Sequence, residues 1–226
     1  MEIMFDTVNI ADIKKYGEIF PYTGVTSNPS IIKAEGKIDF FNHFKEIREI
    51  IGFDKTLHVQ VTATSADKII QEAEKIVKNI DKAVYIKIPV TEEGLKAIRY
   101  LKQNGYRVTA TAIYTKLQGL MAIQCGADYI APYFNRMENY DMDVDATTIT
   151  YFREAIEKNG YKTKILAASF KNVAQVHKAL SGGAHSITIQ PSLLHNAMGM
   201  AEIDRAVASF NKDFKETMGV DSILEL

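Results

Sequence analysis

The sequence predicts an α/β fold, a closed (β/α)8 barrel of the TIM type with a C-terminal helix, in a single domain that spans residues 1–226. Three observations predict it. Eight short apolar segments alternate with longer amphipathic ones along the whole chain. The short segments are mostly apolar on both faces, as in parallel strands covered by helices. No glycine-rich dinucleotide loop follows the first segment, which disfavours an open doubly wound sheet.

The expected strands are short runs bounded by turn residues. In chain order they cover residues 3–6, 24–26, 57–62, 84–88, 107–111, 129–131, 164–168 and 186–189. A strand followed by a helix, repeated eight times over a chain of this length, is the pattern of the barrel. No linker or low-complexity tract interrupts it, so we expect one domain.

The expected helices are identified by their spacing and by the residues at their ends. Asn9 or Asp12 can start the first helix, and several later helices end at a glycine, as at Gly105 and Gly126. The remaining expected helices cover residues 40–51, 65–80, 91–105, 115–125, 145–158, 172–180 and 200–218.

Composition excludes several classes of function. The formal net charge is −1, from 27 Lys and Arg against 28 Asp and Glu, so neither nucleic acid nor a membrane surface is an expected partner. The single cysteine, Cys125, rules out an intrachain disulfide and fits a reducing compartment. The N-terminus does not resemble a signal peptide, and we expect a cytoplasmic protein. The five histidines show no metal-binding spacing, so we expect neither a metal nor a cofactor.

Polar residues stand late in several of the apolar strands. They are Asp6, Gln60, Lys87, Thr111 and Ser169, with Asn28 just beyond the second strand. Chemistry in these barrels takes place at the C-terminal ends of the strands, so we expect these groups to converge on one mouth. His58, by contrast, is expected to face away from them.

Lys87 gives the sharpest indication of chemistry. It stands between Ile86 and Ile88, where burial disfavours the charged ammonium relative to the neutral amine. A neutral lysine amine attacks carbonyl carbons and forms a Schiff base. The residue pattern alone leaves two other interpretations open, a lysine that reaches solvent from an edge strand and an ion pair with Asp6 or another acid.

The other candidates also have alternative roles. Asp6 is the expected carboxylate beside Lys87, or else the cap of the first helix. Asn28 is held extended by Pro29 and binds substrate or caps a turn. Tyr133 is a proton-transfer candidate or a packing residue.

A phosphate site is expected in the late loops. Arg136 and the hydroxyl of Ser169 lie where such barrels often bind phosphate, near a helix N-terminus. The alternatives are a surface arginine and an N-cap serine. Lys171 is expected to be solvated.

Several segments together resemble the short transaldolases and the fructose-6-phosphate aldolases. These are Phe5-Asp6-Thr7, Gly24-Val25-Thr26-Ser27-Asn28-Pro29-Ser30, Val84 to Thr91 around Lys87, Ala131-Pro132-Tyr133 with Asn135-Arg136, and Leu166 to Lys171. The resemblance covers essentially the whole chain. It implies that Lys87 is the Schiff-base residue of a class I aldolase, an aldehyde-lyase.

The resemblance also implies the remaining roles. Asp6, Gln60, Thr111 and Tyr133 would complete the catalytic set, the last three holding a water, and Thr26, Asn28, Arg136 and Ser169 would bind a sugar phosphate. Gln60 and Tyr133 match the aldolase subgroup, whereas short transaldolases usually carry Glu and Phe there. A Gln amide does not exchange a proton at neutral pH, so acid–base work would shift to Tyr133 and its water.

The resemblance implies cleavage of fructose 6-phosphate to dihydroxyacetone and glyceraldehyde 3-phosphate, and the reverse. One alternative is a transaldolase of the pentose phosphate pathway, which transfers the dihydroxyacetone unit between sugar phosphates. A barrel that only binds a phosphosugar, or an isomerase without covalent chemistry, is a further alternative. A homo-oligomer, a pentamer or decamer, is also implied, with the C-terminal helix packing on a neighbour.

Overall fold

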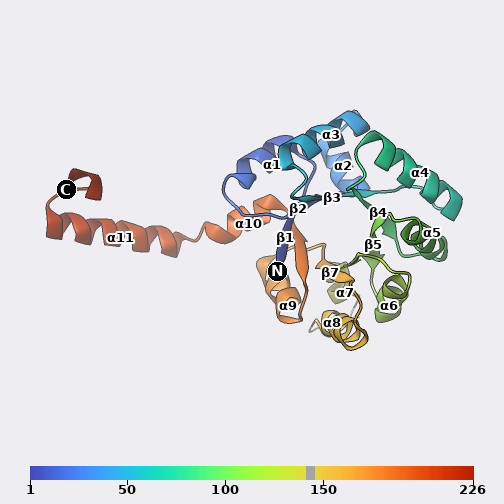
Figure 1. Ribbon diagram of the computed structural model, residues 1–226. Helices are drawn as coiled ribbons and strands as arrows, with labels where there is room; N and C mark the ends of the chain where they lie inside the picture. Colours follow the sequence, from blue (N-terminus) through green and yellow to red (C-terminus); the bar gives the residue numbers. More distant parts are fainter. Residues whose placement is uncertain (141–145) are drawn as a thin grey trace. The chain divides into compact units, whose positions relative to one another are not determined.

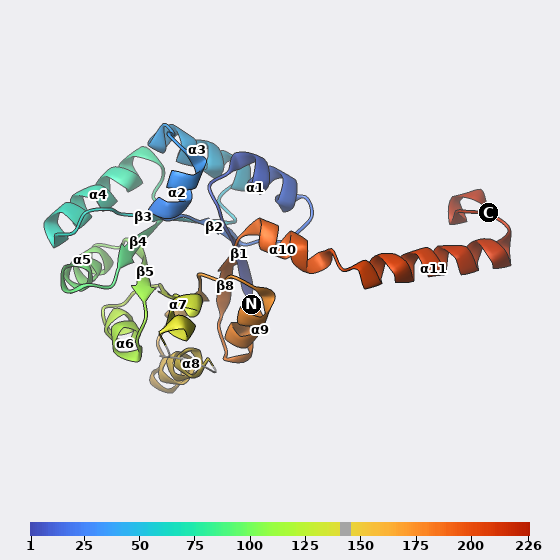
Figure 2. The same ribbon diagram turned by 180° about the vertical axis from the view of Figure 1, so that it is seen from behind.

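The computed structural model describes residues 1–140 and 146–226, which form two compact units, Met1–Pro191 and Ser192–Leu226. In the first unit eight parallel strands close into a barrel in chain order, so the predicted (β/α)8 fold is confirmed. Figures 1 and 2 show most of the helices of this unit in a ring around the strands. The prediction that residues 1–226 form one domain stays a prediction.

The strands are short, and they lie where the apolar runs predicted them. They are β1 (Glu2–Asp6), β2 (Gly24–Thr26), β3 (Thr56–Gln60), β4 (Tyr85–Pro89), β5 (Arg107–Ile113), β6 (Tyr129–Pro132), β7 (Lys164–Ala167) and β8 (Ser186–Ile189). β1 pairs with both β2 and β8, which closes the barrel and leaves no strand edge open.

The longer helices follow the predicted segments, and three short ones were not expected. The helices are α1 (Ile10–Gly17), α2 (Pro29–Glu35), α3 (Phe40–Ile51), α4 (Ala66–Asn79), α5 (Glu92–Gln103), α6 (Lys116–Gln124), α7 (Phe134–Asn139), α8 (Thr147–Asn159), α9 (Val173–Ser181), α10 (Pro191–Met198), α11 (Ala201–Met218) and the 3-10 turn η1 (Ile223–Glu225). Sequence reasoning missed α2, α7 and α10, because so few turns give no clear periodicity. Asp145, the expected first residue of one helix, lies outside the described residues.

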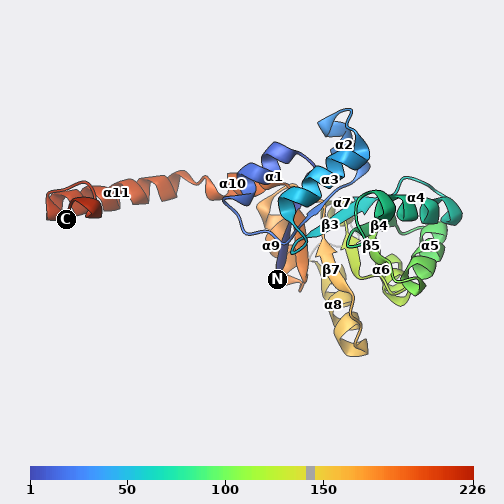
Figure 3. The same cartoon turned by 45° about the horizontal axis from the view of Figure 1, so that its top comes forward.

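Figure 3 shows α1, α3 and α4 following one another around the outside of the strands. Some of the helices begin at caps that the sequence predicts, as α1 and α5 do. Asn9 accepts from the backbone N–H of Asp12 at 2.8 Å, and Thr91 accepts from that of Gly94 at 3.0 Å. Ser65 was expected to open α4 but makes no side-chain cap bond; the Glu93 carboxylate accepts from the first amide of α4 instead.

Alternate residues of each strand divide between two environments. On β4, Ile86 and Ile88 are fully buried, whereas Lys87 between them bonds the Ser27 carbonyl of β2's following loop. On β5, Val108 is likewise fully buried and Thr109 bonds a side chain of β3. The barrel interior is therefore partly polar, while an apolar layer separates the strands from the helices.

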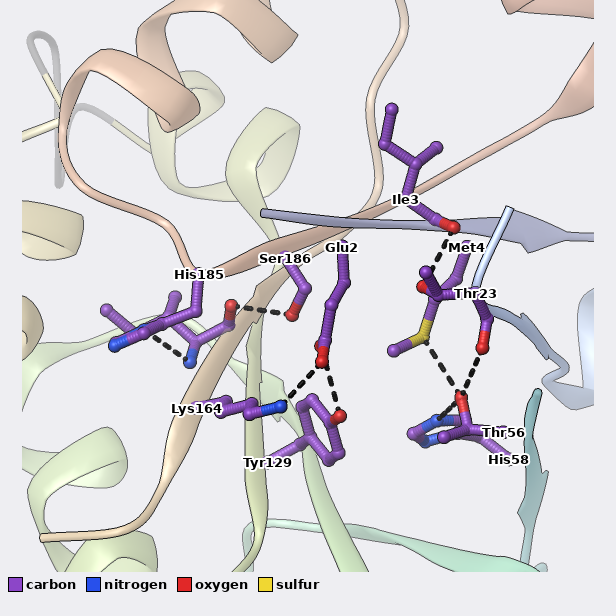
Figure 4. A network of polar contacts seen from close by, with 11 residues as sticks. Glu2, Ile3, Met4, Thr23, Thr56, His58, Tyr129, Lys164, His185 and Ser186 are labelled. Carbon is purple, nitrogen blue, oxygen red and sulfur yellow. Dashed lines mark hydrogen bonds and ion pairs between the residues drawn. The ribbon is translucent and has the colours of Figure 1, made fainter. Parts of the chain in front are cut away.

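The N-terminal end of the strands is filled by polar and aromatic side chains (Figure 4). The Glu2 carboxylate lies between Lys164 and Tyr129 and accepts hydrogen bonds from both, at 2.5 and 3.1 Å. The ring of His58 stacks on Tyr85, with centroids 4.7 Å apart. This end of the barrel is thus packed with mutually bonded side chains.

The second unit, Ser192–Leu226, is mostly the 18-residue helix α11. Ile203, Val207, Phe210 and Phe214 are spaced so that they share one face of this helix. Among the described residues, no helix combines the length and apolar character that crossing a membrane would require.

Candidate active site

Lys87 lies in the interior of the barrel. Its side chain is 2% exposed, and its Nζ donates a hydrogen bond to the carbonyl oxygen of Ser27 at 3.1 Å. A closed barrel has no edge strand from which a lysine could reach solvent, so that alternative is wrong. Among the described residues Lys87 makes no ion pair either. The structure thus leaves a primary amine inside the barrel with one neutral acceptor.

Asp6, at the end of β1, is a carboxylate that interacts electrostatically with this amine. Its Oδ1 accepts a hydrogen bond from the Thr26 hydroxyl at 2.8 Å. Burial raises the pKa of Asp6, and the charge of Lys87, the Thr26 hydrogen bond and the charge of Lys171 act in the opposite direction. Asp6 does not cap α1, because Asn9 does.

Thr26 is fully buried and also pairs with the hydroxyl of Thr188 at 2.5 Å. With its hydroxyl engaged on both sides, Thr26 orients the Asp6 carboxylate. Its predicted contact with substrate stays a prediction.

Gln60 lies beside Lys87 in the register of β3 and β4. Its Oε1 is buried and has no hydrogen-bond partner among the described residues. An unpaired buried amide oxygen costs free energy, so this atom indicates a group that binds here, a water or a substrate hydroxyl.

Thr111 and Tyr133 come together across the mouth. The Thr111 hydroxyl donates to the Tyr133 phenol oxygen at 3.3 Å. Directly after Thr111 the backbone forms a bulge, with Ala112 at φ 55° and a register shift between Ala110 and Ile113. Bulges beside active sites redirect side chains, and this one follows the residue that contacts Tyr133.

Asn28 has the capping role that the sequence left open. Its Oδ1 accepts from the backbone N–H groups of Ser30 and Ile31, at 2.9 and 3.1 Å, and so starts α2. Its carbonyl oxygen is thereby engaged, while its amide nitrogen can donate to a substrate hydroxyl.

Arg136 and Ser169 lie on two segments that contact each other. Arg136 is exposed on α7, and the Ser169 carbonyl accepts from the backbone N–H of Asn135 at 3.2 Å. Ser169 adopts φ 66°, a left-handed conformation that is rare for serine. It does not cap α9, because Asn172 does.

Lys171 was expected to be merely solvated. Its side chain is exposed, yet its charge lies close enough to lower the pKa of Asp6. Its ammonium therefore contributes positive potential to the same mouth, which sequence reasoning missed. Its position two residues after Ser169 was the available signal.

His58 does not face away from the other candidates, so this expectation was wrong. It is fully buried inside the barrel, with Nδ1 2.8 Å from the Thr109 hydroxyl and Nε2 3.0 Å from that of Thr56. Burial lowers the pKa of His58 to about 3, helped by the charges of Lys87 and Arg48. Counting two residues back from Gln60 would have placed it on the inner face.

Among the described residues, no three His, Cys, Asp or Glu side chains are grouped so as to hold a metal ion. That neither metal nor cofactor takes part stays a prediction. The described site therefore offers an amine, a carboxylate, a phenol and an unpaired amide, with cationic groups beside the mouth.

Comparison with known proteins agrees with this set of groups. The family model described as Transaldolase/Fructose-6-phosphate aldolase matches residues 3–225. The chain is 49% identical over 214 residues to a protein of Streptococcus pneumoniae (strain ATCC 700669 / Spain 23F-1) named "Probable fructose-6-phosphate aldolase". That alignment covers 95% of this chain and 96% of the relative.

Proposed function

The chain belongs to the transaldolase/fructose-6-phosphate aldolase family, and we propose that it is a class I aldolase that cleaves fructose 6-phosphate to dihydroxyacetone and glyceraldehyde 3-phosphate, and catalyses the reverse. One observation carries the proposal. Lys87 is only 2% exposed and lies inside a closed barrel whose N-terminal end is packed. The name of the pneumococcal relative, a probable fructose-6-phosphate aldolase, supports fructose 6-phosphate as the substrate.

The first step forms a covalent intermediate. Nζ of Lys87, as the neutral amine, attacks the C2 carbonyl carbon of the ketose, and the resulting carbinolamine loses water to give an iminium ion. The proton that the departing hydroxyl needs comes from Asp6 or from a water held at Gln60. Asp6 suits proton exchange because burial raises its pKa toward the working range.

The second step breaks the C3–C4 bond. A base removes the proton of the C4 hydroxyl, the C4–O bond becomes a carbonyl, and the electron pair of the C3–C4 bond moves into the iminium to give an enamine. The base is a water bound by Gln60, Thr111 and Tyr133, or Asp6 itself. The unpaired Gln60 Oε1 and the Thr111–Tyr133 hydrogen bond support the water.

Substrate binding involves the remaining groups. Arg136 and the Ser169 hydroxyl hold the phosphate, with Lys171 adding positive charge beside them. The amide nitrogen of Asn28 donates to a substrate hydroxyl. Glyceraldehyde 3-phosphate leaves first, and the enamine remains on Lys87.

The fate of the enamine separates two activities within the family. Protonation and hydrolysis release dihydroxyacetone, as in an aldolase. Attack on an aldose phosphate such as erythrose 4-phosphate transfers the three-carbon unit, as in a transaldolase of the pentose phosphate pathway. Gln60, which has no carboxyl proton to exchange, favours the aldolase.

Borohydride trapping tests the covalent step. The protein is incubated with fructose 6-phosphate or dihydroxyacetone, reduced, and the adduct is located by mass spectrometry. We expect one adduct on Lys87 and none in Lys87→Ala. A wild type without adduct, or an adduct that persists in Lys87→Ala, would reject the Schiff base in favour of a barrel that only binds or isomerises phosphosugars.

A second assay separates aldolase from transaldolase. Release of glyceraldehyde 3-phosphate from fructose 6-phosphate alone supports the aldolase, whereas strict dependence on erythrose 4-phosphate supports the transferase. Gln60→Glu should gain transferase activity relative to wild type; an unchanged ratio of the two activities would contradict the role given to Gln60.

The assembly and location belong to the same proposal. The apolar face of α11 needs a covering surface, because an isolated amphipathic helix is marginal in water. We assign that surface to a neighbouring protomer in a pentamer or decamer. A single cysteine supports a location in the reducing cytoplasm.

A further inference from the structure

A buried glutamine that the mechanism does not use connects the two segments of the phosphate site. Gln175 of α9 is 6% exposed. Its Nε2 donates to Asn135 Oδ1 at 3.1 Å and to Glu138 Oε2 at 2.7 Å, and both acceptors belong to α7. Its Oε1 accepts from the backbone N–H of Lys171 at 2.7 Å. The side chain thus bonds α7 on one side and the loop after β7 on the other.

The two bonded segments are the ones that carry the phosphate-binding groups. Arg136 stands next to Asn135 on α7, and Ser169 stands two residues before Lys171. Among the described residues, two backbone bonds join α7 itself to the segment after β7, from the N–H of Phe134 to the Ala168 carbonyl and from the N–H of Asn135 to the Ser169 carbonyl. A third, from the N–H of Ala168 to the Pro132 carbonyl, lies just before α7. The side chain of Gln175 adds three more bonds across the same junction.

We propose that Gln175 is a positioning residue that fixes α7 against the loop after β7, and so sets the separation between the Arg136 guanidinium and the Ser169 hydroxyl. This inference rests on the proposed function, because it concerns the phosphate of that substrate. Gln175 itself touches neither the phosphate nor the reacting carbons.

Two features of the segments explain why they need such a connection. α7 is only six residues long, too short to hold its position through its own hydrogen bonds. The loop carries Ser169 in a left-handed conformation, which persists only when surrounding contacts impose it. A glutamine suits this place because its amide supplies two donors toward α7 and an acceptor toward the loop.

Glu138 completes the connection. It also accepts from Lys178 Nζ at 2.8 Å. Burial raises the pKa of Glu138, but the hydrogen bonds from Lys178 and Gln175 and the charge of Lys178 outweigh it and hold that pKa below the ordinary value. The carboxylate is therefore charged at neutral pH and accepts from both partners.

The experiment compares a phosphorylated with an unphosphorylated acceptor. Aldol addition of dihydroxyacetone to glyceraldehyde 3-phosphate and to glyceraldehyde uses the same covalent chemistry, and only the first needs the phosphate site. In Gln175→Met we expect KM for glyceraldehyde 3-phosphate to rise about tenfold, which corresponds to a loss of about 1.4 kcal/mol in binding free energy. KM for glyceraldehyde and borohydride trapping with dihydroxyacetone should stay within about twofold of wild type.

Two further variants make the result decisive. Asn135→Ala removes one partner of Gln175 from the α7 side and should produce the same selective rise, which also decides the matter if Gln175→Met does not fold. Thr163→Val is the matched control. It deletes a buried side-chain hydrogen bond to the Ala127 carbonyl at 2.7 Å. Thr163 directly precedes the first residue of β7, far along the strand from Ser169, so both KM values should stay unchanged.

Equal rises in KM for both acceptors, or no rise in folded Gln175→Met and Asn135→Ala, would overturn the positioning role. A selective rise in Thr163→Val would do so as well. Failure of the proposed function looks different, because then wild type forms no borohydride-trapped adduct and gives no aldol product with either acceptor.

Discussion

At the scale of single residues, the site consists of ionisable groups whose surroundings oppose their charge. Asp6 and His58 are both drawn toward the neutral form by burial, and the charge of Lys87 acts on both of them. Proteins tolerate such groups where function requires them, at a cost in stability. Asp6 and His58 therefore each predict a measurable dependence of stability on pH.

Asp6→Asn should lower activity and raise stability at neutral pH. The folded-state pKa of Asp6 is raised above 3.8, so the folded protein holds this proton to a higher pH than the unfolded chain. Its contribution to stability therefore falls as pH rises upward from about 3.8. Asparagine does not titrate, so the variant lacks this loss of stability. Its kcat should drop by about a hundredfold or more, because the proton carrier has been removed.

Urea unfolding at pH 4 and pH 7, together with aldol kinetics, checks the Asp6 prediction. Asp54→Asn, at an exposed site between α3 and β3, is the control and should change neither quantity appreciably. A variant of Asp6 that is less stable than wild type at pH 7 would contradict the prediction.

His58→Phe should flatten the loss of stability in acid. The pKa of His58 is about 3 in the folded protein and about 6.5 for an unperturbed histidine, so between these limits the unfolded chain binds a proton that the folded protein excludes. Wild type should lose roughly 1 kcal/mol per pH unit in this window from this residue alone. Phe keeps a ring that can stack on Tyr85 but does not titrate.

The measurement is the free energy of unfolding from pH 7 to pH 4 in both proteins. His177→Gln, at an exposed site on α9, should leave the wild-type slope unchanged. Parallel curves for wild type and His58→Phe would show that His58 is not neutral when folded.

At the scale of elements, close packing between helices and strands positions the chemistry. The bulge in β5 places Thr111 against Tyr133, and the segment after it leads into α6. α6 in turn packs on α8 at Gly119, where an added Cβ would lie 2.2 Å from the ring of Phe152. This glycine permits a helix approach that no larger residue allows.

Gly119→Ala should therefore destabilise the protein although alanine is the better helix former. Overpacking against Phe152 costs about 1–3 kcal/mol, which exceeds the gain of about 1 kcal/mol in helix propensity. Denaturant unfolding measures the difference. Leu117→Ala, at a 66% exposed site on the same helix, should change stability by less than about 0.5 kcal/mol, and a Gly119→Ala protein as stable as wild type would refute the close contact.

At the scale of the whole molecule, closure of the barrel brings distant segments to one mouth. Lys87, Asp6 and Tyr133 come from β4, β1 and the segment just after β6, and the ring of eight strands brings these strands into one barrel. The assembly proposed for α11 belongs to this scale too, because a face of one protomer would be completed by another.

Phe210→Asp should reduce the mass of the assembly. A charge in the middle of the apolar face of α11 disfavours burial against a neighbour. Sedimentation or light scattering should show species smaller than those of wild type. Lys212→Asp, on the same helix but off the apolar face, serves as the control. An unchanged mass with lower thermal stability would show that α11 covers its own barrel instead.

The sequence determined the fold class, the strand positions and the site segments. The eight buried strands are apolar runs in the sequence, and a lysine between two isoleucines stands out there, because periodicity and polarity are local properties. The short helices α2, α7 and α10 could not be predicted from the sequence, because one or two turns show no detectable hydrophobic periodicity.

Only the tertiary structure decided what each polar group does. It showed that the Oδ1 of Asn28 caps a helix and that the Thr26 hydroxyl donates a hydrogen bond to Asp6. It also placed His58 inside the barrel. It further revealed the hydrogen bond of Gln175 to Asn135, forty residues earlier in the chain, which no local pattern indicates. The physical reason is that a hydrogen-bond partner is fixed by chain closure in space, whereas burial and periodicity are written into neighbouring residues.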